Sequence, residues 1–395
     1  MESRLDRHAA PAITPEAPPP AAKRIAFVVT EDWFFASHFL PLARAARELG
    51  LEVAVIARVR DHRAAIEATG ARVIPLEAER RSLNPMAAGY SAGRLAAILK
   101  SWRPDIVHCI ALRPILIGGA AALMAGIPRR VYALTGLGFL GARRDLLGRG
   151  ARTAVRMLVR GLETRETHYL FENPDDAALV GLDPDDASRV TILGGAGVDA
   201  DALRPQPLPP QPPLRIAVVA RMLWSKGIDT AVEAQKIARG RGATVELSLY
   251  GAPDPSNPKA IPEETLRAWS GEPGTTWHGR TEDVAGVWAA HHVCCLPSRG
   301  GEGLPRTLLE GGASGRALVT TDVPGCRRLV RDGAEGVVVP PDDPDALAQA
   351  FARLAADPSL VARMGEAARK RVLDGFTERD VMEAAKRVWT AMLAR

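Results

Sequence analysis

The chain has 395 residues, of which 47% are hydrophobic and 25% are charged, and its formal net charge at pH 7 is +5. These values are typical of a folded globular protein, and the length predicts two domains of roughly 180 residues each. The charge is too small for a broad nucleic-acid-binding surface, and no run of about 18 apolar residues predicts a membrane-spanning helix. We therefore expect a cytoplasmic two-domain protein that binds no nucleic acid.

The N-terminal segment and the cysteines both bear on the compartment. Residues 1–22 are rich in proline and alanine and lack the apolar core of a signal peptide, so we interpret them as a disordered leader. The cysteines lie in or beside apolar, strand-like runs without Cys-x-x-Cys spacing: Cys109, Cys294, Cys295 and Cys326. We expect buried, reduced thiols and no metal site.

Residues 23–204 alternate short β-type runs with helical periodicity, beginning with a strand at 25–29, a helical pattern over 37–49 and a strand at 51–57. The later strand-like runs are 72–75, 105–110, 130–135, 169–171 and 190–193, with helical patterns at 87–102 and before residue 125. Strands that alternate with helices predict a parallel sheet covered on both faces. We interpret this region as one Rossmann-like α/β domain.

Residues 205–213 are dominated by proline, which argues against a helix or a central strand, so we interpret them as an extended linker. The alternation restarts over 214–376, with strands expected at 214–220, 245–250, 293–296, 317–320 and 336–339. A final helix within 377–395 could pack back on the first domain. Two doubly wound domains in tandem leave a central cleft between the carboxyl ends of their strands, where such sheets bind ligands.

The segment 297–316 combines a strand end, a glycine-rich turn and a helix start. Pro305 fits the first turn of a helix, where its missing N–H costs nothing. Glu302 would lie at the mouth of this helix and Glu310 two turns inside it, about 12 Å further along. That distance is roughly the span of a diphosphate between two sugars, although two surface glutamates would give the same pattern.

Two cations lie in the loop that follows the expected strand 214–220. Arg221 can bind two phosphate oxygens at once, and Lys226 adds a point charge, so the pair suits a diphosphate. A solvated loop is the alternative interpretation. Because this loop and the Glu302 loop should open on the same cleft, we favour a site that could stabilise a leaving diphosphate without a metal.

Two other motifs suggest different chemistry. Asp-x-Asp pairs at 183/185, 199/201 and 343/345 could bind a metal, but the first and third are Asp-Pro-Asp, which we interpret as helix caps. Residues 136–141 match the Gly-x-Gly-x-x-Gly of dinucleotide-binding enzymes, but they follow about the fifth strand and not the first. We interpret them as a flexible wall of the cleft.

A basic helix is expected after that loop, because Arg149, Arg152, Arg156 and Arg160 recur at helical spacing beside an apolar stripe. A basic face of this kind could bind anionic lipid, at about 1 kcal/mol per cation near the surface. A solvated arginine face on a core helix is the alternative.

Together these patterns resemble the family 4 glycosyltransferases, which have the two-domain GT-B fold, from residue 23 onward. The resemblance is to the branch that builds bacterial capsule, O-antigen and lipid-linked glycans. Its signature is a pair of glutamates separated by seven residues, here Glu302 and Glu310. The other segments that carry it are 30–38, 173–176, 194–199, 221–227, 296–298 and 321–325.

The resemblance implies a retaining, metal-independent enzyme that uses a nucleotide sugar, most often a UDP-sugar, and no cofactor. Arg221 and Lys226 would hold the diphosphate and Glu302 the donor sugar, so these three would be catalytic. The donor-binding set would be Arg221, Lys226, Glu302, Gly303, Leu304, Pro305, Arg306, Thr307 and Glu310, with Glu310 on the ribose and the backbone amides of 304–307 around phosphate. The acceptor would lie near His38, His108, Arg113, Gly136 and Gly138.

One position departs from the family pattern: Ile110 stands where many members have a second histidine, which bears against a catalytic role for His108. The expected activity is transfer of a hexose or N-acetylhexosamine to a polyprenyl-diphosphate-linked or other glycan acceptor. A sugar-nucleotide epimerase of the same fold is the alternative. Two further alternatives are a non-catalytic nucleotide-sugar sensor and, more remotely, a NAD-dependent oxidoreductase.

Overall fold

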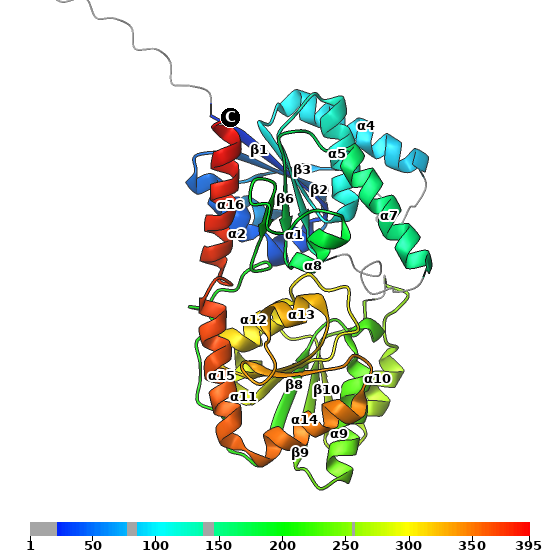
Figure 1. Ribbon diagram of the computed structural model, residues 1–395, viewed down its shortest axis with the longest axis vertical. Coiled ribbons are helices and arrows are strands. Elements are labelled where there is room, and N and C mark those ends of the chain that lie inside the picture. Colours follow the sequence, from blue (N-terminus) through cyan, green and yellow to red (C-terminus); the bar gives the residue numbers. More distant parts are fainter. Residues whose placement is uncertain (1–21, 77–84, 137–145, 255–256) are drawn as a thin grey trace, which may run out of the picture.

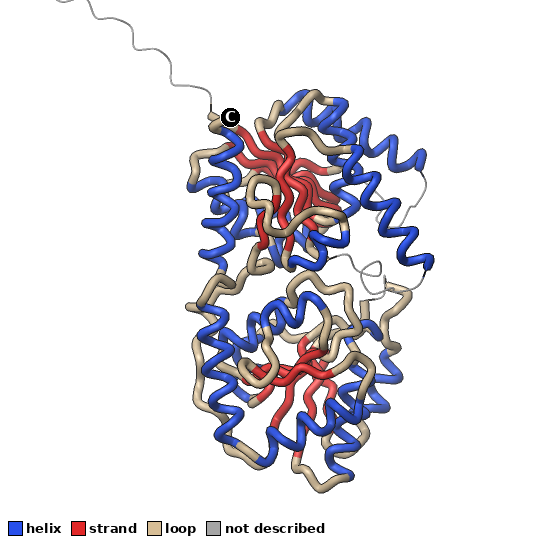
Figure 2. The backbone as a smooth tube through the Cα atoms, viewed as in Figure 1, coloured by secondary structure: helices blue, strands red, loops and turns tan. Residues whose placement is uncertain are grey.

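The computed structural model describes residues 22–76, 85–136, 146–254 and 257–395, which form two lobes, each built on a parallel sheet (Figure 1). Within these residues the N-terminal sheet has seven strands in the order β3-β2-β1-β4-β5-β6-β7, and the C-terminal sheet has six in the order β10-β9-β8-β11-β12-β13. Helices lie on both sides of each sheet (Figure 2). Because the order reverses at β1/β4 and at β8/β11, both sheets are doubly wound, which confirms the predicted fold class.

The N-terminal sheet is buried on both faces. Ile25 and Phe27 of β1 pack in the core on one face, and Ala26 and Val28 pack on the other, as the two-residue period of a strand requires. The strands are β1 (Arg24–Glu31), β2 (Glu52–Arg58), β3 (Arg72–Pro75), β4 (Ile106–Ile110), β5 (Arg130–Leu134), β6 (Thr167–Phe171) and β7 (Val190–Ile192). The helices are α1 (Asp32–His38), α2 (Leu40–Glu48), α3 (Arg63–Glu67), α4 (Pro85–Trp102), α5 (Leu112–Met124), α7 (Leu146–Gly161) and α8 (Pro174–Leu179).

The C-terminal sheet repeats this arrangement with β8 (Leu214–Val219), β9 (Val245–Tyr250), β10 (Thr275–Gly279), β11 (Val293–Leu296), β12 (Ala317–Thr321) and β13 (Gly336–Val339). Its helical segments are a 3₁₀ turn (Trp224–Lys226), α9 (Ile228–Gly240), α10 (Glu263–Ser270), α11 (Val284–Ala290), α12 (Arg306–Ala313), α13 (Pro324–Leu329), α14 (Pro344–Ala356) and α15 (Pro358–Leu373). Strand β10 was not predicted. It is an edge strand whose outward residues are exposed, so it lacks a strong apolar run.

The last helix, α16 (Glu378–Leu393), packs on the N-terminal domain although it follows the C-terminal one (Figure 1, red). The helix starts with a capping box in which Thr377 and Asp380 exchange hydrogen bonds. Trp389 is fully buried, and its ring centroid lies 5.8 Å from that of Phe27 in β1. Arg44 of α2 also forms an ion pair with Glu378 at 2.8 Å.

We expect Trp389→Ala to lower the free energy of unfolding by about 3–5 kcal/mol, because it removes a fully buried indole from the N-terminal core. Urea denaturation followed by circular dichroism would measure the loss. Thr390→Ala, at the next and exposed position of the same helix, is the control and should change the unfolding free energy by less than about 0.5 kcal/mol. Equal stability of the two variants would contradict the packing of α16.

The structure changes two local predictions. The helical pattern over 37–49 is split into α1 and α2, because Pro41 lies in the first turn of α2 and cannot donate to the preceding turn. Asp343 caps α14 as predicted, through the N–H of Ala346 at 2.9 Å, whereas Asp183 accepts the N–H of Asp185 in a turn that starts no helix.

All four cysteine thiols are free and buried, as predicted. Burial raises the pKa of the Cys109 and Cys326 thiols to about 12, so both stay protonated near neutral pH. Across the part of the chain that the structure describes, no helix is both long enough and apolar enough to cross a bilayer.

Candidate active site at the domain interface

The loop that carries Glu302 joins β11 to α12 at the carboxyl edge of the C-terminal sheet. It turns through Gly301, whose φ of 79° lies in the left-handed region that favours glycine. Helix α12 begins at Arg306, with Pro305 as its N-cap residue. Glu302 therefore lies in the loop before the helix and not at the helix mouth as predicted.

Glu302 and Lys226 meet although 76 residues separate them. The Lys226 Nζ lies 2.6 Å from Glu302 Oε1, and the Ser298 hydroxyl donates to the same oxygen at 3.2 Å. Both charged side chains are largely buried, with exposed fractions of 16% and 17%. The turn after Lys226 packs tightly on the Glu302 loop, since a Cβ at Gly227 would lie 2.0 Å from the Pro297 carbonyl oxygen. The two predicted loops thus form one polar centre.

Arg221, in the same loop as Lys226, is about half exposed and contacts Asp254 at 3.3 Å. It lines a cavity of about 600 Å³ between the two domains. Trp33 and the segment 60–62 line the cavity from the N-terminal domain, and Tyr250 and Arg280 line it from the C-terminal domain. A cavity of this size, open to solvent and bordered by arginines, has room for a nucleotide.

Glu310 is buried in α12, and burial raises its carboxyl pKa above the ordinary value. Arg306, one turn earlier, binds it through Nε at 2.7 Å. The same guanidinium also donates to the Ser37 carbonyl across the domain interface. That carbonyl is available because Pro41, four residues later, has no N–H to offer it. Arg306 therefore ties the predicted ribose-binding glutamate to the N-terminal domain.

The predicted ring of phosphate-binding amides is smaller than expected. Pro305 has no N–H, and the Leu304 N–H donates to Glu172 of the N-terminal domain at 2.6 Å. The amides of Arg306 and Thr307 are the first of α12 and have no partner within the helix. Of the four residues expected to bind phosphate through their amides, only Arg306 and Thr307 therefore offer an N–H group to an anion at the start of α12.

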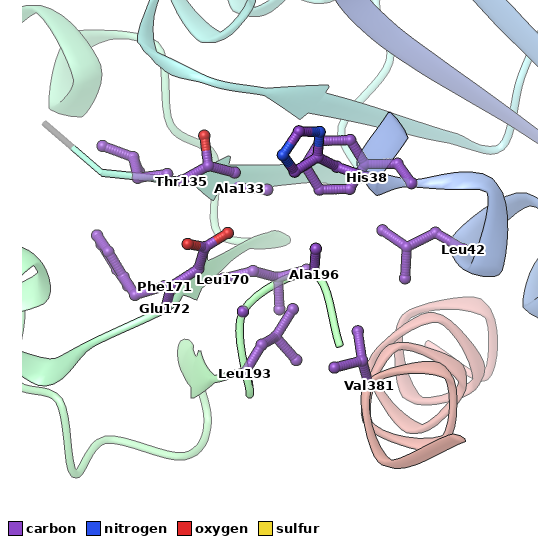
Figure 3. Close-up of a pocket in the computed structure, with 13 residues that line it drawn as sticks. His38, Leu42, Ala133, Thr135, Leu170, Phe171, Glu172, Leu193, Ala196 and Val381 are labelled. Carbon is purple, nitrogen blue, oxygen red and sulfur yellow. The ribbon is translucent and has the colours of Figure 1, made fainter. Parts of the chain in front are cut away.

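His38, at the end of α1, faces the same interface. Figure 3 places its ring in a cavity with Thr135 and Glu172, among mostly apolar side chains. The Ser37 hydroxyl lies 2.6 Å from its Nδ1. Burial, assisted by the charges of Arg306, Arg221 and Lys226, lowers the pKa of His38 to about 4. His38 is therefore a neutral imidazole near pH 7.

We expect His38 to stay neutral as the pH falls from 7 to about 5, which imidazole ¹⁵N chemical shifts would measure, with His38→Gln to assign the signal. Because its pKa is lower in the folded chain than in the unfolded chain, this group contributes stability above pH 6.5 that is lost as the pH falls towards 4. A titration midpoint near 6.5 would contradict the burial of the ring.

The other predicted acceptor-side residues lie in different parts of the N-terminal domain. His108 is fully buried in β4 between Phe27 and Trp389, and burial lowers its pKa to about 3, so we correct its assignment: it is a core residue out of reach of an acceptor. Arg113 lies in the first turn of α5, at the carboxyl edge of the sheet, and Gly136 contacts the Glu302 loop. Gly138 lies outside the described residues, as does the rest of the Gly-x-Gly-x-x-Gly match.

Sequence reasoning missed Glu172 and assigned no role to Asn173. Both follow β6 directly and contact the Glu302 loop. The available signal was their position, because polar residues just after a parallel strand lie at the ligand-binding edge of the sheet.

Comparison with known proteins identifies the chemistry. Residues 24–164 match the family described as "Glycosyl transferase 4-like", and residues 213–357 match the family described as "Glycosyl transferases group 1". The chain belongs to the family 4 glycosyltransferases. The N,N'-diacetylbacillosaminyl-diphospho-undecaprenol alpha-1,3-N-acetylgalactosaminyltransferase of Campylobacter jejuni is 24% identical to this glycosyltransferase over 315 residues, which are 76% of this chain and 81% of the relative.

Solved structures share the fold of this glycosyltransferase. A glycosyltransferase from Rickettsia africae superposes with a TM-score of 0.75 at 17% identity, covering 94% of this chain and 99% of that one. Anabaena HepE, in complex with UDP and glucose, superposes with a TM-score of 0.73 at 14% identity, covering 93% and 100%. The family decides against the oxidoreductase alternative. In this glycosyltransferase the Lys226–Glu302 pair lies in the segment that leads into α12.

Proposed function

We propose that this enzyme transfers a hexose or N-acetylhexosamine from a UDP-sugar to a lipid-linked glycan in bacterial surface polysaccharide synthesis, with retention of configuration. The Lys226–Glu302 pair beside the start of α12 is the observation that carries the proposal. Two comparisons support it: the Campylobacter jejuni relative is named for a diphospho-undecaprenol acceptor, and the Anabaena neighbour was solved with UDP.

In this proposal the diphosphate lies between Arg221, Lys226 and the amides of Arg306 and Thr307. These donors are fixed before the reaction, so they stabilise the charge that develops on the leaving diphosphate without reorganisation. We infer that they take the part a metal plays in other transferases and that no cofactor is needed. Glu302, now bound to Lys226, would contact the donor sugar, and Glu310 would exchange Arg306 for the ribose hydroxyls.

The test is to incubate the purified enzyme with a panel of nucleotide sugars and lipid-linked acceptors in the presence of EDTA. We expect a product with the anomeric configuration of the donor. Absence of both transfer and donor hydrolysis would refute the proposal, and loss of activity in EDTA would refute its metal-independent part. Conversion of the donor sugar without any acceptor would instead indicate an epimerase.

Contact with the membrane is a separate part of the proposal. On α7, Met157 and Leu158 are 65% and 55% exposed, and Arg149 and Arg156 of the same helix are also exposed. A helix that exposes both apolar and arginine side chains suits the headgroup region of an anionic bilayer. We propose that this helix brings the enzyme to its lipid-linked acceptor.

Co-sedimentation with vesicles would test this contact. We expect binding to phosphatidylglycerol vesicles that weakens with salt, and weak binding to phosphatidylcholine vesicles. Met157→Ser combined with Arg149→Gln should reduce the bound fraction while leaving transfer to a water-soluble acceptor unchanged. Equal binding to phosphatidylglycerol and phosphatidylcholine vesicles, or equal binding by the wild type and the double variant, would contradict a membrane contact through α7.

A further inference from the structure

Two side chains of the N-terminal domain hold one peptide unit of the Glu302 loop from both sides. Glu172 Oε2 accepts the N–H of Leu304 at 2.6 Å, and Asn173 Nδ2 donates to the carbonyl of Gly303 at 3.1 Å. These N–H and carbonyl groups belong to the same peptide unit and point in opposite directions. The two contacts therefore fix both the position and the plane of that unit.

The peptide unit lies in a space that leaves no room for a larger residue. Glu172 is 8% exposed and Asn173 is fully buried. A Cβ at Gly303 would lie 2.0 Å from Glu172 Oε2 and 2.7 Å from the Thr135 carbonyl carbon. On the other side, a Cβ at Gly325 would lie 1.9 Å from the Gly303 carbonyl oxygen. The loop is thus enclosed by both domains.

The charges around Glu172 favour its neutral form. The charged groups that shift its pKa are Asp176 of α8 and Glu302 of the loop, both acidic. His38, which lines the same cavity, is neutral near pH 7 (Figure 3). Burial, followed by the two carboxylates, raises the pKa of Glu172 to about 8 although the Leu304 N–H opposes the shift. A neutral carboxyl group still accepts this N–H through its carbonyl oxygen.

We propose that Glu172 and Asn173 form an interdomain clamp that closes on the Gly303–Leu304 peptide unit and positions Glu302 for transfer. The clamp couples closure of the domains to the placement of Glu302, one residue before the clamped unit. Glu172 and Asn173 act through the loop backbone, so they are positioning residues and not catalytic ones. Their kinetic role rests on the proposed function, whereas the clamp itself does not.

Three variants separate positioning from simple folding. Glu172→Ala leaves the Leu304 N–H without its partner, and we expect kcat to fall roughly 10- to 100-fold with a smaller change in UDP affinity. Glu172→Gln keeps the shape and a carbonyl acceptor and should restore most of kcat. Asn173→Ser keeps a hydroxyl to cap α8 but loses the donor to Gly303, so it should also lower kcat.

Asp175→Asn is the matched control. It breaks another interdomain contact from α8, the exposed ion pair between Asp175 and Arg327 at 2.6 Å, and should leave kcat unchanged. Wild-type kcat in both Glu172→Ala and Asn173→Ser would overturn the clamp. If Glu172→Ala does not fold, Asn173→Ser alone decides: reduced kcat supports the clamp, and wild-type kcat overturns it.

Small-angle X-ray scattering of the full chain without donor tests the clamp independently of activity. The closed form binds the Glu172 proton more tightly than an open form with an ordinary carboxyl pKa, so closure weakens as the pH rises from about 5 through 8. We expect the radius of gyration to rise over this range in the wild type and to stay constant in Glu172→Gln, with Glu172→Ala open throughout. Scattering shifts without any transferase activity would support the clamp and refute the proposed function. Identical, pH-independent scattering in all variants would overturn the clamp.

Discussion

Lys226→Ala should lower kcat by roughly 100- to 1,000-fold and weaken UDP binding. The side chain is largely buried, and its ammonium group is the cation closest to Glu302 at the proposed diphosphate site. Removing one fixed donor from a site where charge develops costs about this factor. The variant also leaves the largely buried Glu302 carboxylate without its counter-ion, so the loop that carries Glu302 should become less ordered. Steady-state kinetics and isothermal titration with UDP would measure the two effects.

Lys236→Ala is the matched control for this variant. Lys236 also forms an ion pair with a glutamate, Glu272, at 2.7 Å, but on the surface of the same domain. It should leave both kcat and UDP affinity unchanged, as expected for an exposed pair. If Lys226→Ala and Glu310→Ala both bind UDP like the wild type, the donor site is assigned to the wrong residues.

Gly303→Ala should lower kcat by at least about 100-fold without unfolding either domain. The added methyl group would overlap Glu172 and the Thr135 backbone, so the loop must move by about 1 Å or the domains must separate. The backbone itself is not strained by the substitution, since no left-handed φ is found at Gly303. Steady-state kinetics and thermal unfolding of the same sample would show whether a lower kcat comes from the displaced loop or from an unfolded domain.

Gly93→Ala provides the comparison, because a Cβ at Gly93 of α4 meets no atom within 4 Å. This change should leave kcat unchanged and raise stability by up to about 1 kcal/mol through helix propensity. Full activity of Gly303→Ala would show that the loop does not lie against the N-terminal domain during turnover.

The fold could be predicted from the sequence because its strands are buried apolar runs and its helices are periodic. Both signals arise from burial, and both are weak at sheet edges and at breaks between helices. The sequence pattern does not indicate edge strand β10, because the outward residues of this strand are polar. The helical periodicity over 37–49 continues through Pro41, although this proline begins a new helix.

The candidate site could be predicted in part. Loops after parallel strands meet at one edge, so Lys226 and Glu302 could be expected to approach each other, as they do. The two errors had a different origin. The family resemblance places His108 in the cleft, but the side chain lies in the middle of a buried strand and points into the core. The resemblance also predicts a free Leu304 amide, whereas this amide donates to Glu172, 132 residues away in the sequence. Contacts between domains leave no local pattern in the sequence.

The position of α16 has a consequence for synthesis on the ribosome. The strands of the N-terminal sheet are translated by residue 192, and α1 and α2 cover part of the face that carries Phe27. The part of this face that Trp389 covers stays open until α16 has been made. At a translation rate of about 5–20 residues per second, this part of the surface stays exposed for roughly 10 to 40 s. The N-terminal domain therefore completes its core only after the C-terminal domain has been translated.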